Sequence, residues 1–207
     1  MRTSQQLWKR NKDIALVSLK SKFVQGIKLG NLPKENFQAY IAQDYFFLES
    51  FARAYGLAIS KCTDIKSIRT LSELLFGVSE ELILHEKYAN DWGINLNNNQ
   101  IEKCTNEYTD FLKKTSLELT CIEILAAMAP CMRLYSWIGK NLSPPESNNP
   151  YKDWIITYSD ESFEKLSKSL EDIIDSYNGS YDFNQLNNLY KKAMILEGEF
   201  FNEYSNF

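Results

Sequence analysis

Three polar side chains fall where the helical repeat of their segments calls for apolar residues. Asp44 lies on the apolar stripe of one segment, Glu197 on that of another, and Cys131 on a third, one turn before Tyr135. A thiol can add to a ligand as a nucleophile, and a carboxyl group can exchange protons with that ligand. Because an unpaired buried charge costs several kcal/mol, reactive groups aimed inward from three helices indicate a functional interior.

Each of these residues also has a purely structural interpretation. A cysteine among apolar neighbours is usually a small buried hydrophobe, and an inward carboxylate can be paired with a buried arginine. His85 shares a stripe with aliphatic residues, which favours a core histidine with satisfied ring nitrogens. Tyr108, Tyr135 and Tyr158 are most simply core aromatics whose hydroxyls find a partner. The polar groups taken together favour a site more than any one of them does.

The elements that must position these groups are helices separated by short breaks. Thr120 and Glu123 form a capping box, which predicts a helix start at that point. Asn97-Asn98-Asn99 is a polar break. Helical periodicity covers about residues 4–21, 34–62, 64–90, 120–142, 161–177 and 184–204, with further helical repeats after residues 101 and 150. Without an interdomain linker or an internal repeat, we expect an all-α fold, a single helical bundle domain over residues 1–207.

Composition narrows the classes of function. The 207 residues are 44% hydrophobic and 24% charged, which is typical of a folded globular protein, and only eight glycines and five prolines are present. The net charge of −4 and the lack of a basic block predict no nucleic acid partner. The longest uncharged apolar run, residues 124–132, is shorter than the ~20 residues that cross a bilayer, and no signal sequence is apparent. We therefore expect a cytoplasmic protein with no membrane partner.

Cysteine and histidine usage argues against metal chemistry. Cys62, Cys104, Cys121 and Cys131 form no Cys-x-x-Cys pair and are expected to be free thiols. With His85 as the single histidine, zinc and di-iron sites and a Ser-His-Asp triad are disfavoured. No Gly-x-Gly-x-x-Gly or Walker-type loop is present either. We expect neither a metal nor a cofactor.

A series of short motifs runs along nearly the whole chain. They are Phe23-Val24-Gln25-Gly26-Ile27, Gly30, Leu32-Pro33, Ala42-Gln43-Asp44-Tyr45, Ile124-Leu125-Ala126-Ala127, Pro130-Cys131, Leu134-Tyr135, Pro150-Tyr151, Trp154-Ile155, Thr157-Tyr158 and Glu197. In this order and spacing the chain resembles the TenA family, the thiaminase II or aminopyrimidine aminohydrolases, and specifically its cysteine type. The resemblance implies a heme-oxygenase-like helical bundle, commonly a homotetramer, that binds a pyrimidine in its interior.

The resemblance also implies roles for individual residues. Cys131 matches the nucleophile, and Glu197 matches the carboxyl group that donates a proton. Asp44 matches the carboxylate that holds the ring nitrogen and amino group of the pyrimidine.

The aromatic residues match the substrate-binding positions, with one departure. Tyr108, Tyr135 and Tyr158 match tyrosines that line the ring site. Three residues after the motif aspartate, the family often has a tyrosine whose hydroxyl is credited with raising the reactivity of the cysteine. This chain has Phe47 there.

The reaction implied is hydrolysis of 4-amino-5-aminomethyl-2-methylpyrimidine, and of thiamine, to 4-amino-5-hydroxymethyl-2-methylpyrimidine in thiamine salvage. Cysteine addition to the pyrimidine ring would make this displacement feasible. Two alternatives stay open from the residues: a non-catalytic helical protein that binds or responds to a pyrimidine or another small ligand, and a heme-oxygenase-like oxidase with His85 as a lone heme ligand.

Overall fold

The computed structural model describes residues 1–94, 96 and 100–206, and the described part of the chain is all α-helical, without a strand. The expected all-α fold is therefore confirmed. The helices are α1 (Thr3–Leu19), α2 (Lys22–Leu29), α3 (Lys34–Lys61), α4 (Ile65–Trp92), α5 (Lys103–Glu118), α6 (Cys121–Leu142), α7 (Lys152–Ser159), α8 (Glu161–Ser176) and α9 (Phe183–Glu203). The predicted polar break at Asn97-Asn98-Asn99 lies outside the described residues.

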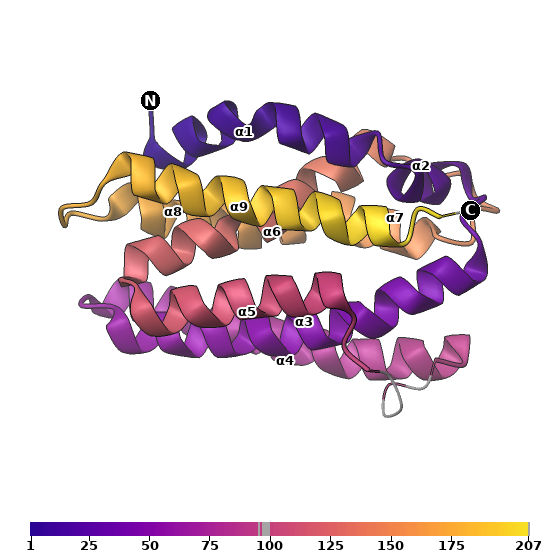
Figure 1. Cartoon of the computed structure of the whole chain (residues 1–207), viewed down its shortest axis with the longest axis horizontal. Helices are drawn as coiled ribbons and strands as arrows, with labels where there is room; N and C mark the ends of the chain where they lie inside the picture. Colours follow the sequence, from indigo (N-terminus) through magenta and orange to yellow (C-terminus); the bar gives the residue numbers. More distant parts are fainter. Residues whose placement is uncertain (95, 97–99, 207) are drawn as a thin grey trace.

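The helices pack in two layers along the long axis of the molecule (Figure 1). One layer holds α3 with α4 and α5 packed against it, and the other is built around α6, which contacts α7, α8 and α9. The helix α1 lies along α9 on the outer side of the second layer. The layers meet where α6 contacts α3 and α5, so the inward stripes of α3, α5, α6 and α9 face a common core.

Local sequence signals explain where helices begin and end. The predicted capping box at the start of α6 is present, with Thr120 and Glu123 satisfying each other's backbone amides. The sequence pattern did not predict α2 as a separate helix. Ser21 starts it by accepting a hydrogen bond from the Val24 amide, and Gly30 ends it in the left-handed conformation at φ 69°. Other predicted boundaries differ from the observed ones by a few residues, as expected where helix ends fray.

The helix α6 is the central core element. By length and hydropathy it is the one helix among the described residues that could cross a membrane, but 78% of its apolar window is buried inside the bundle. That burial is what a core helix of a folded bundle requires.

Gly139 lets α6 approach α7 closely, because a Cβ atom at that position would lie 2.4 Å from the backbone carbonyl carbon of Tyr158.

Candidate functional site

Cys131 and Glu197 come together between α6 and α9. The Cys131 thiol lies within hydrogen-bonding reach of the Glu197 carboxyl group, and the Tyr108 hydroxyl donates to Glu197 Oε1 over 2.7 Å. Glu197 is only 1% exposed, and this burial raises its pKa to about 8 even though the hydrogen bonds from Tyr108 and Cys131 oppose the shift. The carboxyl group is therefore mostly protonated at neutral pH and can give a proton to a ligand.

The environment of Cys131 disfavours a free thiolate. Burial raises the pKa of this thiol well above its ordinary value, and the negative charges of Glu197, Asp44 and Glu81 raise it further. A thiolate at this position consequently needs a proton acceptor close by. Glu197 is the candidate, since its carboxyl group lies within hydrogen-bonding reach of the thiol.

Asp44 is held in place by the single histidine of the chain. His85 Nε2 lies 3.0 Å from Asp44 Oδ2, and His85 Nδ1 lies 3.2 Å from the backbone oxygen of Glu81. Both ring nitrogens therefore face an acceptor. Burial opposes a positive charge on the ring, but the hydrogen bond and negative charge of Asp44 outweigh it, so the pKa of His85 is raised. The environment of Asp44 thus favours the protonated form of His85.

A third carboxyl group, Glu81 of α4, belongs to the same cluster. Burial and the negative charge of Asp44 raise its pKa to about 7, while His85 opposes the shift. The Tyr158 hydroxyl donates to Glu81 Oε1 over 3.4 Å, which connects α7 to this group. The cluster therefore contains carboxyl groups from α3, α4 and α9 together with the His85 imidazole.

Aromatic residues form the remaining wall of the site. The ring of Tyr135 lies 4.8 Å from that of Tyr158 and 5.8 Å from that of Trp154. The hydroxyls of Tyr135 and Tyr40 share a hydrogen bond of 3.1 Å, and the indole of Trp154 donates to Tyr40 over 3.4 Å. Flat faces with nearby hydroxyls suit a heteroaromatic ring that carries polar edges.

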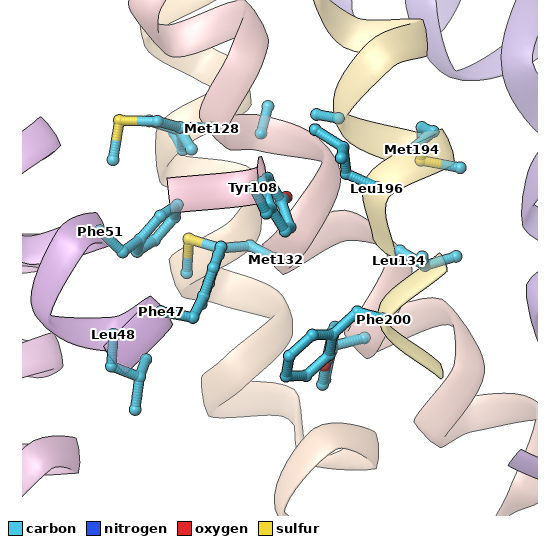
Figure 2. Packing of buried hydrophobic residues seen from close by; sticks show 14 of the residues in the cluster. Phe47, Leu48, Phe51, Tyr108, Met128, Met132, Leu134, Met194, Leu196 and Phe200 are labelled. Carbon is cyan, nitrogen blue, oxygen red and sulfur yellow. The ribbon is translucent and has the colours of Figure 1, made fainter. Parts of the chain in front are cut away.

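Phe47 takes part in the packing behind Glu197. Its ring centroid lies 4.7 Å from that of Tyr108 and 5.4 Å from that of Phe51, and only 5% of the residue is exposed. Figure 2 shows Phe47 and Phe51 of α3 and Tyr108 of α5 among the packed side chains of the core. Phe47 therefore borders the ring of Tyr108, whose hydroxyl bonds Glu197, without supplying a hydroxyl itself.

A cavity of about 260 Å³ opens on one side of this cluster. Its lining includes His85 and Glu81 of α4 and Trp154 and Tyr158 of α7, with Asp153 at its edge. His85 and Tyr158 belong both to the cavity wall and to the network around Asp44 and Glu81. A ligand entering by this cavity would meet aromatic faces and carboxylates, which together favour a cationic aromatic molecule.

The structure brings together all seven residues that the sequence singled out for the site: Asp44, Phe47, Tyr108, Cys131, Tyr135, Tyr158 and Glu197. It also adds Glu81, which sequence reasoning missed. Glu81 lies one helical turn before His85, so the pair at i and i+4 was the available signal. Both ring nitrogens of His85 have hydrogen-bond partners, as the structural interpretation expected, but one of these partners is Asp44 of another helix. Neither ring nitrogen is therefore free to bind a heme iron.

Known proteins have similar sequences over most of the length of this chain. The bifunctional TH2 protein, mitochondrial, of Arabidopsis thaliana is 34% identical over 94% of this chain, which spans only 36% of the plant protein. The aminopyrimidine aminohydrolase of Halalkalibacterium halodurans is 34% identical over 74% of this chain and 71% of that protein.

Solved structures share the fold. A TenA family transcription regulator from Silicibacter sp. TM1040 superposes with a TM-score of 0.92 at 26% identity, covering 100% of this chain and 97% of that one. Heme oxygenase-1 from Synechocystis sp. PCC6803 superposes at 0.64 with 13% identity, covering 98% and 92%, which confirms the heme-oxygenase-like fold. The model of the TENA/THI-4/PQQC family matches residues 8–206, and the chain belongs to that family.

Proposed function

We propose that this protein hydrolyses 4-amino-5-aminomethyl-2-methylpyrimidine, and thiamine, to 4-amino-5-hydroxymethyl-2-methylpyrimidine. The observation that carries the proposal is the meeting of Cys131, Glu197 and Asp44 from three helices around one buried site. The similarity to curated aminopyrimidine aminohydrolases supports it. Both substrates present a pyrimidine and a positive charge, which suits aromatic walls and three carboxyl groups.

In the first step, the Cys131 sulfur adds to the ring carbon next to a ring nitrogen. Glu197 in its carboxylate form takes the thiol proton, since the two groups share a hydrogen bond. Asp44, held by His85, binds the ring nitrogen and amino group and so orients the electron-rich adduct. Tyr135 and Trp154 supply faces against which the ring can stack.

In the second step, the bond between the exocyclic methylene and its leaving group breaks. Glu197 gives its proton to the departing amine, which reacts in its neutral form, and ammonia leaves. With thiamine, the thiazole leaves as a neutral ring, and Glu197 releases its proton to solvent. Water then adds to the methylene carbon, the carbon–sulfur bond breaks and the Cys131 thiol is restored. The aminopyrimidine and water give hydroxymethylpyrimidine and ammonia, whereas thiamine and water give hydroxymethylpyrimidine, the neutral thiazole and a proton.

The decisive assay compares the parent protein with Cys131→Ala on both compounds. We expect Cys131→Ala to abolish turnover while pyrimidine binding stays within about tenfold, because a nucleophile contributes more to the transition state than to ground-state affinity. Cys104→Ala is the matched control, since Cys104 contacts Thr105 and Tyr204 away from the cluster. Substantial turnover by Cys131→Ala would remove the cysteine from the mechanism.

A non-catalytic role is the second candidate, favoured by the absence of a hydroxyl at Phe47. Tight pyrimidine binding by the parent protein without ammonia release would support this regulatory or binding role instead. We also propose that the protein acts in thiamine salvage in the cytoplasm. Residues 1–207 would form one domain, and the chain would assemble as a homotetramer. Light scattering of the purified chain tests the tetramer.

A further inference from the structure

Two cysteines that the proposed reaction does not use lie face to face where α3 ends and α6 begins. Cys62 directly follows α3, and Cys121 is the first residue of α6. Their sulfur atoms are 2.6 Å apart although the residues are 59 positions apart in the chain. Since sulfur atoms in a disulfide are separated by about 2.05 Å, bond formation requires only a small closure.

Lys61 holds the segments around these two thiols together. Its ammonium group donates to the backbone oxygens of Ser116, Leu117 and Leu119 at 2.7, 3.0 and 2.6 Å. These bonds tie the end of α3 to the turn that leads into α6. The approach of the two sulfur atoms is therefore fixed by neighbouring backbone contacts as well as by the cysteines themselves.

The thiol pair is accessible to small molecules. Both cysteines line a cavity of about 440 Å³, together with Lys61, Asp64 and Tyr177. Cys62 is partly exposed, whereas Cys121 is 8% exposed. Burial raises the pKa of both thiols, but the hydrogen bond from Cys121 lowers that of Cys62 while the pairing raises that of Cys121. Cys62 is thus the thiol of the pair that loses its proton more readily.

We propose that Cys62 and Cys121 are an oxidation site and form a reversible disulfide when the protein meets a peroxide. The Cys62 thiolate attacks one oxygen of hydrogen peroxide and becomes a sulfenic acid, and hydroxide leaves with the thiol proton as water. The Cys121 sulfur then attacks the Cys62 sulfur, and a second water leaves. Two thiols are oxidised by two electrons, the peroxide is reduced to two waters, and a dithiol reverses the reaction.

The bond would link two of the helices that carry residues of the candidate site. The helix α3 carries Asp44 and Phe47, and α6 carries Cys131 and Tyr135. A covalent link between their ends removes conformational freedom from the unfolded chain, and the effect grows with the length of the closed loop. The oxidised protein should therefore resist unfolding better than the reduced one. The proposal does not depend on the proposed hydrolase activity.

Peptide mapping tests the bond directly on the full chain. The protein is treated with hydrogen peroxide, free thiols are blocked with N-ethylmaleimide, and the sample is digested with trypsin and a Glu-specific protease without reduction. This digestion separates Cys62, in residues 62–66, from Cys121, in residues 119–123, and isolates Cys131 in residues 124–133. We expect the first two peptides to be linked, two hydrogen atoms lighter than their sum, and to separate with dithiothreitol.

Thermal unfolding provides the second measurement. Oxidation should raise the Tm of the parent protein by roughly 5–15 °C, reversibly. Cys104→Ser should behave like the parent because Cys104 has no cysteine partner among the described residues, whereas Cys62→Ser should show no rise. The proposal is overturned if, after peroxide treatment, Cys62 and Cys121 are both still free thiols that react with N-ethylmaleimide. It is also overturned if either cysteine is found linked to another cysteine. Mapping of the parent protein decides this even if Cys62→Ser does not fold.

Discussion

His85 Nε2 lies 3.0 Å from Asp44 Oδ2 and joins α4 to α3 at the centre of the candidate site. Since the other ring nitrogen faces the Glu81 backbone oxygen, the imidazole orientation is fixed from both sides. A carboxylate that must hold a ring nitrogen and an amino group needs a defined direction, and this contact supplies it. His85 is therefore a positioning residue for Asp44.

We expect His85→Leu to raise KM and lower kcat for aminopyrimidine, because it leaves Asp44 buried without its partner. A hydrogen bond to a charged group is worth ~1.5–3 kcal/mol, which corresponds to a loss of about 10- to 100-fold in kcat/KM. His85→Gln keeps a donor and should recover part of the loss. Steady-state kinetics on both variants checks this, with Asp44→Asn as the reference for losing the carboxylate itself. Unchanged KM and kcat in His85→Leu would contradict the role.

Glu197→Gln should lower kcat by about 10²- to 10⁴-fold, since the amide keeps the shape but cannot transfer the proton. Steady-state kinetics of this variant beside the parent protein checks this.

The raised pKa of Glu197 also predicts how the activity of the parent protein depends on pH. The active pair of Cys131 and Glu197 holds one proton, and below the Glu197 pKa of about 8 the pair holds two. The kcat/KM of the parent protein should therefore rise with pH, about tenfold per unit, and level off above 8.

Glu81 must be separated from Glu197 in that profile, because its pKa of about 7 lies close by. We expect Glu81→Gln to retain the rise that ends near pH 8, whereas Glu197→Gln loses it. A parent profile that is flat from pH 6 to 9 would show that the two protons of the pair do not control the rate.

Phe47→Tyr should lower the pKa of Cys131 and speed aminopyrimidine hydrolysis near neutral pH, if the added hydroxyl reaches the thiolate and stabilises it. The gain is limited, since Phe47 is packed against Tyr108 and Phe51 and a phenolic oxygen must fit there. The measurement is the pH dependence of iodoacetamide alkylation at Cys131, read on the peptide of residues 124–133, beside turnover. Identical alkylation in a well-folded variant would point to Tyr135 as the activating phenol.

Gly139→Ala should destabilise the contact between α6 and α7. The added Cβ would meet the Tyr158 backbone carbonyl carbon at 2.4 Å, and overpacking of this kind costs about 1–3 kcal/mol. The expected fall in Tm is roughly 2–12 °C, with weaker pyrimidine binding because Tyr158 moves. Gly56→Ala is the control, as nothing lies within 4 Å of that Cβ and α3 gains a better helix former. Equal Tm values for the two variants would refute the close approach.

The helical character of the protein and the side chains that turn inward could be predicted from the sequence, because helical periodicity is a local property of a few consecutive turns. Asp44, Cys131 and Glu197 could be recognised in this way, each as a polar group on an apolar stripe. The capping box of Thr120 and Glu123 was equally readable, since both partners lie within one turn.

Which helices face each other could not be predicted in this way, because it depends on side-chain packing between segments far apart in the chain. No periodicity shows that His85 meets Asp44, 41 positions away, that Glu81 bonds Tyr158 or that Cys62 touches Cys121. The raised pKa of Glu197 has the same origin, because desolvation arises only when the packed bundle removes water from around the carboxyl group.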